Sequence, residues 1–226
     1  MNWKKIFLII IIIAAILGGG IIMFNRTNKK IVTQAYSFNK FNKVSVDIPT
    51  GDIIFKTSSK YGVSYSGLGK IAPDVKVKNG NLKISFSKAG IHVNMFNLKQ
   101  LNSKIIIEMP KEELTDLNIE SANGNVNADY LATKNGDIDL ANGNISIKEL
   151  KTRKGASFDT AKGNIEVNKC NASGYDLDTS LGKITVSGKK RGDSFENNSD
   201  TENVLETDTS LGSIKINGSF ANPVDG

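Results

Sequence analysis

Apolar and polar residues alternate along much of the chain, and from Leu117 onward the alternation repeats around a glycine. The recurring phrases read IESANGNVNA, DLANGNISI, DTAKGNIEV, DTSLGKITV and DTSLGSIKI. Their glycines, at intervals of 19, 20, 19 and 30 residues, are Gly124, Gly143, Gly163, Gly182 and Gly212. A fixed period of this length is typical of a stacked repeat, in which each unit buries its apolar face against its neighbours.

The repeat places apolar side chains in fixed columns. Two and four residues after each glycine stand the pairs Val126/Ala128, Ile145/Ile147, Ile165/Val167, Ile184/Val186 and Ile214/Ile216. Five residues before each glycine stand Ile119, Ile138, Phe158, Leu177 and Thr207. Because side chains alternate across a strand, these columns predict the inner face of two strands per repeat, with the glycine at the bend between them. A second glycine column, Gly136, Gly155 and Gly174, predicts the other bend.

Two strands and two turns in 19–20 residues predict one coil of a parallel β-solenoid (β-helix). Residues 117–218 are expected to form the regular coils, and like residues should stack on like residues. An antiparallel sandwich is the alternative interpretation. Antiparallel pairing does not require side chains to match at one fixed period, so the matched columns favour the solenoid.

A more irregular, strand-rich part is predicted over residues 43–116. The segment VSVDIPTGDIIF already carries the repeat phrase, with Gly51 in the glycine position. KIIIEMP is a further strand that ends at Pro110, because proline cannot donate to a strand ladder. No stretch after residue 30 shows a convincing helical period. The whole domain is therefore predicted to be all-β.

An uninterrupted apolar run occupies residues 6–24. Nineteen residues in a helix would extend for roughly 28 Å, which matches the hydrocarbon core of a bilayer. The run predicts one transmembrane helix that anchors the chain in the cell membrane, and a cleaved signal peptide is the alternative. Residues 1–5 are then a cytoplasmic N-terminus, residues 25–42 a polar juxtamembrane spacer and residues 219–226 a tail. The C-terminal domain is expected to be extracytoplasmic, although the flanking positive charges are nearly balanced.

The net charge of +6 arises almost entirely from the flanks of the apolar run. Lys4, Lys5, Arg26, Lys29 and Lys30 are five of the 29 basic residues, so residues 31–226 carry 24 basic against 23 acidic side chains. A nearly neutral domain without a basic stripe gives no electrostatic footprint for nucleic acid. The single cysteine, Cys170, excludes an intrachain disulfide and is expected to be a small buried residue.

Acidic residues recur at two outward positions of the repeat. Four residues before the glycines stand Asp47, Glu120, Asp139, Asp159, Asp178 and Asp208, and two residues earlier stand Asp137, Asp176 and Glu206. These columns predict a row of carboxylates on one flank of the solenoid. One interpretation is a solvated face that neighbouring lysines neutralise; the other is a face that binds cations or a cationic peptide. The chain has neither the EF-hand spacing nor the glycine-rich nonapeptide of calcium-binding β-rolls, so we expect no metal site and no cofactor.

An insertion at residues 188–200 contains Arg191, Gly192 and Asp193, the tripeptide that integrin ligands use. A polar insertion between coils predicts an exposed loop, which is either a candidate adhesion loop or a solvated turn with a chance match. The only histidine, His92, has no partner for a metal site or a catalytic triad and is expected to be structural.

The segment KIIIEMPKEELTDLNIESANGNV, followed by serial GNI, GKI and GSI phrases, resembles the bacterial putative-adhesin β-strand-repeat family. The resemblance covers roughly residues 41–218 and implies a β-solenoid ectodomain without an established enzymatic activity. Some members of that family are associated with responses to cell-envelope stress and to cationic antimicrobial peptides. The family defines no functional residues, so none is transferred to this chain.

These observations predict a non-enzymatic, membrane-anchored binding or scaffold protein of the bacterial cell envelope. Its expected partners are the membrane and a cell-wall polymer, an envelope protein or a cationic peptide. A surface adhesin acting through the Arg191–Asp193 loop is one alternative. A carbohydrate-active β-helix enzyme is another, but equivalent coils should give the paired carboxylates equal environments, which general acid catalysis does not suit. The oligomeric state stays open, because an uncovered strand at the last coil could pair with another molecule.

Overall fold

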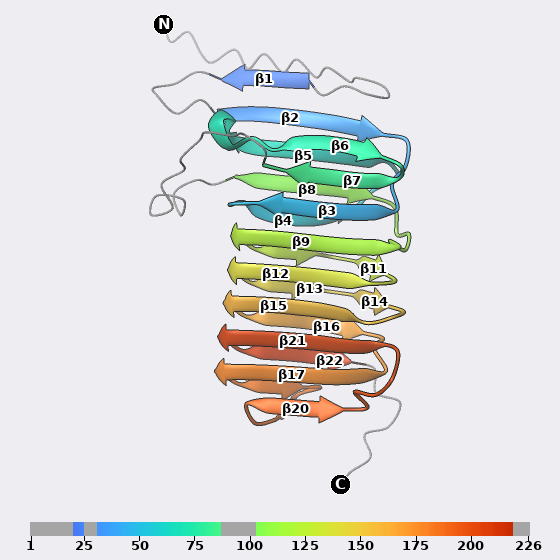
Figure 1. Ribbon diagram of the computed structural model, residues 1–226, viewed down its shortest axis with the longest axis vertical. Coiled ribbons are helices and arrows are strands. Elements are labelled where there is room, and N and C mark those ends of the chain that lie inside the picture. The colour runs from blue at the N-terminus through green and yellow to red at the C-terminus, as the bar shows by residue number, and fades with distance from the viewer. Residues whose placement is uncertain (1–19, 25–30, 87–102, 219–226) are drawn as a thin grey trace, which may run out of the picture.

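The computed structural model describes residues 20–24, 31–86 and 103–218, and nearly all of them belong to two stacked β-sheets. Figure 1 shows the strands piled in one long column, with the N-terminal strands at one end and β20 at the other. The only helical segment within the described ranges is η1, a single 3₁₀ turn at Gly69–Ile71. The prediction of an all-β fold is confirmed.

The larger sheet, called sheet A, has 13 strands. Its main path is β1 (Gly20–Phe24), β2 (Ile31–Phe38), β5 (Tyr61–Leu68), β8 (Lys104–Met109), β4 (Asp52–Thr57), β10 (Val126–Ala128), β13 (Ile145–Ile147), β16 (Ile165–Cys170), β22 (Ile214–Gly218), β18 (Ile184–Val186) and β19 (Lys189–Lys190). Two short strands, β11 (Leu131–Thr133) and β14 (Leu150–Thr152), pair beside this path.

The second sheet, called sheet B, has nine strands. They follow the order β20 (Ser194–Asn197), β17 (Gly174–Leu181), β21 (Val204–Leu211), β15 (Ala156–Lys162), β12 (Gly136–Asn142), β9 (Asp116–Asn123), β3 (Lys43–Ile48), β7 (Asn81–Ser85) and β6 (Asp74–Lys78). Each coil contributes one long strand to sheet B and a shorter one to sheet A, so the core lies between the two sheets.

The coils pair in parallel and in register, as the repeat period predicts. Ile145 lies opposite Val126 on one side and opposite Ile165 on the other. In sheet B, Ile138 lies opposite Ile119 and Phe158. All six side chains are fully buried. Removal of such apolar surface from water contributes roughly 25 cal/mol per Å² and is the main stabilising contribution of the stack.

The middle coils contain a third short strand that the two-strand prediction lacked. Leu131 on β11 lies opposite Leu150 on β14, which in turn lies opposite Cys170 at the end of β16. Cys170 is buried, as expected for a small residue at the end of a coil, and burial raises the pKa of its thiol. Three strands per coil give the solenoid a third side in this region.

The glycine at the bend is required because the backbones of neighbouring coils nearly touch there. A Cβ atom on Gly143 would lie 1.8 Å from the carbonyl oxygen of Gly124, and one on Gly163 would lie 1.8 Å from that of Gly143. Gly124 itself has φ +142, a conformation that other residues rarely adopt. The fixed column of glycines therefore follows from stacking, not only from turn geometry.

The last coils do not follow the order of the sequence, which corrects the serial stack that we expected. Ile165 lies opposite Ile214, and Ile214 lies opposite Ile184. The final coil, β21 and β22, is thus inserted between β15–β16 and β17–β18 (Figure 1). The GSIKING segment that ends the repeats is therefore an interior strand and not an exposed edge.

The insertion at residues 188–200 makes this reversal possible and is not simply an exposed loop. It supplies β19 and β20, which pair antiparallel with the outer edges of β18 and β17. The chain then returns through Asn203, whose Oδ1 accepts hydrogen bonds from Thr152 Oγ1 at 2.6 Å and from the Gly155 N–H at 3.1 Å. The insertion therefore covers the edge that would otherwise remain at the end of the stack.

The N-terminal part shows that the spacer predicted for residues 25–42 is wrong over its second half. Residues 31–38 form β2, which pairs antiparallel with β5 over its whole length. Val32 is buried, and Tyr36 and Phe38 pack against the core. The polar alternation of this segment is therefore that of a half-exposed strand, which lies between β1 and β5 near one end of sheet A.

The apolar run at residues 6–24 ends in a strand. Its last five residues form β1, which pairs antiparallel with β2, so the predicted helix does not extend through Gly20–Phe24. Ile21 and Ile22 are β-branched, which suits an extended backbone. Residues 1–19, His92 and the tail at 219–226 lie outside the described residues. Within the described residues, no helix has the length and apolar character needed to cross a membrane.

Candidate functional site on the outer face of sheet B

The first acidic column forms one continuous row across sheet B. In spatial order the paired residues are Asp47, Glu120, Asp139, Asp159, Asp208 and Asp178, one on each strand from β3 to β17. Neighbouring strands lie about 4.8 Å apart, so the row is roughly 24 Å long. The residues on either side along each strand face the core, for example Ile138 and Leu140 around Asp139. The carboxylates therefore point away from the core.

The second acidic column is shorter and contains a residue that the sequence did not reveal. Asp137 lies opposite Ser157, Ser157 opposite Glu206, and Glu206 opposite Asp176. Glu196 on β20 continues this row beyond Asp176. Glu196 lies outside the repeat period, and only the antiparallel pairing of β20 brings it to this face.

Lysines do not neutralise these rows within the described part of the chain. None of the nine predicted carboxylates forms an ion pair there, whereas carboxylates on the other sides of the solenoid do. Examples are Lys148–Asp129 at 2.6 Å, Lys154–Glu202 at 2.6 Å and Lys215–Glu166 at 2.8 Å. The acidic face, defined by the two columns, thus differs from the rest of the surface in its uncompensated charge.

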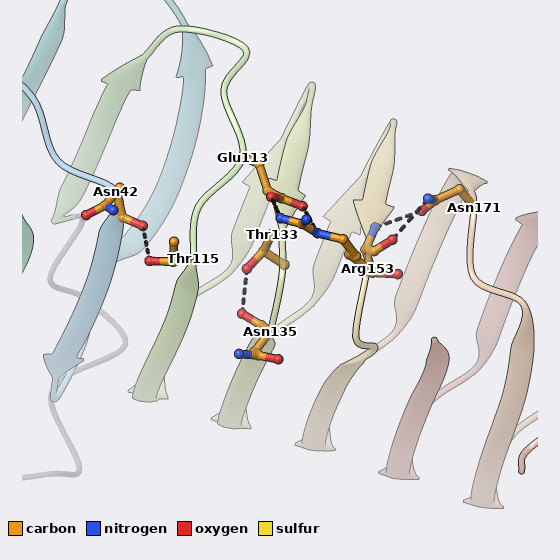
Figure 2. Close-up of polar contacts among 8 residues, drawn as sticks. Asn42, Glu113, Thr115, Thr133, Asn135, Arg153 and Asn171 are labelled. Carbon is orange, nitrogen blue, oxygen red and sulfur yellow. Dashed lines mark hydrogen bonds and ion pairs between the residues drawn. The ribbon is translucent and has the colours of Figure 1, made fainter. Parts of the chain in front are cut away.

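Figure 2 shows how the other corner of the coils pairs its polar groups. The Arg153 guanidinium donates to both carboxylate oxygens of Glu113. Nearby, Thr152 donates its N–H to Asn171 Oδ1 at 2.7 Å, and the Thr115 hydroxyl donates to the Asn42 carbonyl at 3.0 Å. Charge and hydrogen-bonding groups are matched at this corner, which gives it no surplus charge to offer a partner.

The carboxylates of the acidic face do not have equal environments, contrary to our expectation for equivalent coils. Burial, Asp139 and Glu120 raise the pKa of Asp137. Burial also raises the pKa of Asp159, although hydrogen bonds from the Ser157 hydroxyl and the Asp208 N–H oppose the change. Burial and the charges of Asp178 and Glu196 raise the pKa of Asp176. Burial is the main cause of each shift, and the neighbouring negative charges raise the pKa values further.

Two shallow hollows of about 440 Å³ each lie along the acidic face. Asp139, Asp159, Asp178 and Asp208 line the first, and Asp47 and Glu120 line the second. Beside the first acidic column runs a column of small residues, which are Ala122, Ala141, Ala161, Ser210 and Ser180. Several of these also line the hollows. The small side chains leave room for a partner to approach the carboxylates.

Two exposed leucines adjoin the C-terminal end of this face. Leu181 is 70% exposed and Leu211 is 46% exposed, and the two lie opposite each other on β17 and β21. They precede the bend glycines in the two DTSLG phrases. Sequence analysis did not single them out, because inward and outward positions are not distinguished this close to a turn.

The acidic face suits an extended positively charged partner better than a single metal ion. Among the described residues, no group of three or more Asp, Glu, His or Cys side chains has the geometry of a metal site. The carboxylates instead come one per strand at the spacing of the coils. Such a row presents many weak electrostatic contacts to a partner with several positive charges.

The Arg191–Asp193 tripeptide forms the tight link between β19 and β20. The Arg191 guanidinium carbon lies 4.6 Å from the centre of the Phe195 ring, and the Arg191 N–H donates to the Ile184 carbonyl. The Asp193 carbonyl accepts a hydrogen bond from the Thr179 N–H at 2.8 Å. Both ends of the tripeptide are thus fastened to the solenoid, and the arginine packs on an aromatic ring. Its role in adhesion stays a prediction.

Solved structures of putative adhesins are similar to this chain. A putative cell adhesion protein from Clostridium sporogenes is similar with a TM-score of 0.54 and 12% identity, over 90% of this chain and 100% of that one. A putative adhesin from Bacteroides fragilis shows 22% identity and a TM-score of 0.38, over 84% and 98% of the two chains. At these identities the first similarity supports the fold alone. No curated protein matches the sequence.

The family comparison covers almost the whole of the stacked domain. The model of the Toastrack DUF4097 family matches residues 41–219, which begin just before β3 and end just after β22. The resemblance seen in the KIIIEMP segment and the serial glycine phrases is thereby confirmed. This chain belongs to the Toastrack DUF4097 family.

Proposed function

We propose that this chain is a non-enzymatic binding protein of the bacterial cell envelope, anchored in the cell membrane with its β-solenoid outside the cytoplasm. Its acidic face binds a cationic peptide. The observation that carries the proposal is the unbroken row from Asp47 to Asp178, which no lysine or arginine of the described residues neutralises.

Electrostatic cost supports a positively charged partner. Two unit charges about 4–5 Å apart in water repel by roughly 1 kcal/mol before screening. Six carboxylates in one row therefore destabilise the free domain, and a partner that carries several positive charges relieves this repulsion. Some basic groups of the described residues are engaged elsewhere, as in Lys148–Asp129 and Lys215–Glu166.

The shape of the face favours an amphipathic peptide among the cationic partners. Lysines of such a peptide would lie along the carboxylate row, and its apolar side chains would lie over Leu181, Leu211 and the neighbouring small residues. Residues three or four apart on a helix are about 5–6 Å apart, which is close to the spacing of the coils. A cell-wall polymer or an envelope protein with a basic surface are the other partners of the same chemistry.

Neutralisation of three exposed carboxylates tests the binding face. The variant Asp139→Asn/Asp178→Asn/Asp208→Asn keeps the shape of the row and removes three charges. The probe is a cationic amphipathic peptide made of lysine and leucine, and its affinity is measured by titration at low and at physiological salt. We expect the affinity to fall at least about tenfold, equivalent to about 1.4 kcal/mol, and the salt dependence to weaken.

The matched control removes three exposed carboxylates elsewhere. Glu108→Gln/Asp193→Asn/Asp200→Asn makes the same change in net charge without changing the acidic face. Equal losses of affinity in the two variants would show that only net charge matters, and the binding face would be rejected. An unchanged affinity in the first variant would reject it as well.

The membrane anchor rests on the part of the apolar run that precedes β1, residues 6–19, and is tested separately. We expect the full chain expressed in bacterial cells to remain in the membrane fraction after an alkaline carbonate wash. Deletion of residues 6–19 should release it. Recovery of the intact full chain in the soluble fraction would contradict the anchor and leave the peptide-binding face untouched.

A further inference from the structure

Four lysines gather on the outer face of sheet B at the end nearest β1 and β2, beside Asp47, where the first acidic column begins. Lys76 and Lys78 lie on β6, Lys83 on β7 and Lys43 on β3. All four are exposed, and they alternate with core-facing residues such as Val77 and Leu82. We call these four residues the lysine patch. The β6–β7 hairpin that carries three of them turns at Asn79 and Gly80, both with positive φ.

The lysine patch brings like charges together on β6 and β7, whereas Lys43 lies opposite Asp116 on β9. Lys76 lies directly opposite Lys83 across β6 and β7, and Lys78 and Lys43 lie on either side of Asn81. Side chains opposite each other on neighbouring strands have Cβ atoms about 5 Å apart, and like charges there are destabilising. None of the four forms an ion pair with another described residue. The free domain therefore carries an unfavourable arrangement of charge that an anionic surface would relieve.

The position of the patch in the fold indicates which anionic surface is near. β6 and β7 lie at the end of the stack that also holds β1 and β2 (Figure 1). β2 begins at Ile31, directly after the basic residues Arg26, Lys29 and Lys30 that follow the apolar run. If that run enters a membrane, the lysine patch belongs to the part of the domain that lies nearest to the lipid.

We propose that the lysine patch rests against anionic phospholipid headgroups of the membrane that holds the anchor. This inference depends on the anchoring stated above and adds an orientation to it. Each lysine close to an anionic leaflet is attracted to it, and the attraction falls off within a Debye length. The acidic face is repelled by the same leaflet. The carboxylates farthest from the lysine patch, Asp208 and Asp178, are therefore turned away from the membrane.

A second copy of the chain is a poorer occupant of the patch. Face-to-face packing of two sheets B could place the lysine patch of one copy on Asp178 and Asp208 of the other. The same packing would bring the acidic residues of the middle strands, Glu120 and Asp139, close to those of the partner. Nine carboxylates against four lysines leave a large like-charge repulsion. A membrane to which the chain is anchored lacks the repulsion between the carboxylates of two copies. The anchor also gives its headgroups a high effective concentration at the lysine patch.

Lysine footprinting on the full chain tests the inference. The chain is reconstituted in vesicles of phosphatidylcholine alone and in vesicles that also contain phosphatidylglycerol. An amine-reactive reagent and mass spectrometry give the modification rate of each lysine. We expect the lysine patch to react several-fold more slowly in the anionic vesicles. The difference should disappear at high salt, because the Debye length falls to about 3 Å at 1 M.

Lysines on distant coils provide the internal control. Lys169 and Lys183 are exposed and lie in the C-terminal half of the stack, and they should react equally in both kinds of vesicle. The variant Lys76→Glu/Lys83→Glu should abolish the protection of Lys43 and Lys78. Lys169→Glu/Lys183→Glu makes the same change in net charge and should leave that protection intact.

The possible results separate this inference from the proposed anchor. Flotation of the chain with phosphatidylcholine vesicles after a carbonate wash reports the anchor alone. If the chain floats but the patch reacts equally in both vesicles, the lipid contact is overturned and the anchor stands. If the chain does not float, its flotation with anionic vesicles tests whether the lysine patch binds anionic lipid. A loss of that binding in Lys76→Glu/Lys83→Glu supports the contact, and equal binding overturns it.

Discussion

Ile165 on β16 lies opposite Ile214 on β22, although Ile184 is the next residue of the same column along the chain. The coil that carries Ile184 is instead outermost, and β19 and β20 cover its edges. The coil formed by β21 and β22 thus follows the Ile184 coil along the chain but occupies an interior position. Both coils contain the phrase DTSLG, so either would fit against β15 and β16 by its own residues.

Cysteine pairs distinguish the observed order of coils from the serial order. Thr160 lies opposite Thr209, which places Ala161 beside Ser210, whereas Ser180 lies one strand further away. We expect Ala161→Cys/Ser210→Cys to form a disulfide under mild oxidation. Neighbouring strands are about 4.8 Å apart, within the reach of a disulfide, whereas alternate strands exceed the limit of about 7 Å.

The pair Ala161→Cys/Ser180→Cys is the matched control and should remain reduced. Cys170 is buried with a raised pKa and should not compete for either cysteine. Mass spectrometry of peptides from the oxidised proteins identifies the bonds. A disulfide between residues 161 and 180 and none between 161 and 210 would show that the coils stack serially.

The stack itself could be predicted from the sequence because each coil repeats its contacts locally. Val126, Ile145 and Ile165 recur with the bend glycine, and parallel register follows from matching them. The order of the last two coils could not be predicted in this way. β17 and β21 carry almost the same phrase, so the period does not distinguish their neighbours. The choice depends on non-local contacts, such as those of Asn203 with Thr152 and Gly155.

The same distinction applies to the candidate sites. The row through Asp139, Asp159 and Asp208 follows the repeat and was predicted. Glu196 joins the second acidic column, beside Asp176, through the antiparallel pairing of an insertion, which has no period. The lysine patch depends on how the β6–β7 hairpin pairs with β3. Residues 31–38 were interpreted as a spacer, because half-exposed end strands bury too few side chains to show a clear pattern.

Substitution of a bend glycine should destabilise the stack strongly. In Gly143→Ala the new Cβ would lie 1.8 Å from the Gly124 carbonyl oxygen, and the residue already has φ +156. A backbone group cannot move aside without separating two coils. We expect a loss of at least about 3 kcal/mol in the free energy of unfolding, measured with denaturant. Gly192→Ala has open surroundings and should change it by less than about 0.5 kcal/mol.

The ladder of side-chain amides at the bends should also contribute to stability. The Asn144 N–H and Nδ2 donate to Asn125 Oδ1 at 2.9 and 3.2 Å, and Asn144 Oδ1 accepts the Asn164 N–H at 2.8 Å. Asn144→Ala removes the acceptor and leaves a backbone N–H without its partner. We expect a loss of about 1–2 kcal/mol in the free energy of unfolding. Asn127→Ala, on an outward position of β10, should cost less than about 0.5 kcal/mol.

The acidic face should make the stability depend on pH in a defined direction. Burial, and after it the neighbouring negative charges, raise the pKa of Asp137 and Asp176 above the usual value of 3.8. A carboxyl group with a raised pKa in the folded state stabilises the fold when protonated. That contribution is fully present below pH 3.8 and is lost as the pH rises through the folded-state pKa.

The variant Asp137→Asn/Asp176→Asn removes both titrating groups. We expect it to be more stable than the wild type at pH 7 and low salt, by no more than about 1 kcal/mol for each close charge pair removed. The difference should shrink as the pH is lowered towards 4. Denaturant unfolding of both proteins across this range measures it. A difference that grows towards acid pH would contradict the direction of both shifts.

The cap strand β20 should control association of the solenoid. Phe195 lies opposite Leu177, packs against the core and lies beneath the Arg191 guanidinium. Phe195→Asp places a charge at this apolar contact and should detach β20 from β17. The free edge of β17 then presents unpaired backbone groups to other molecules, and such edges associate. We expect the average mass in sedimentation experiments to rise with concentration more steeply than in the wild type.

Asn197→Asp is the control for this change, because it adds the same charge at an exposed position of the same strand. It should sediment like the wild type, since the Asn197 side chain is exposed and a charge there stays in water. If Phe195→Asp unfolds at the wild-type denaturant concentration and still does not associate, the cap is not what protects the edge. The carboxylates of Asp176 and Asp178 on β17 would then be the alternative barrier, because they repel an incoming acidic face. Neutralisation of these two residues in the Phe195→Asp background separates the two explanations.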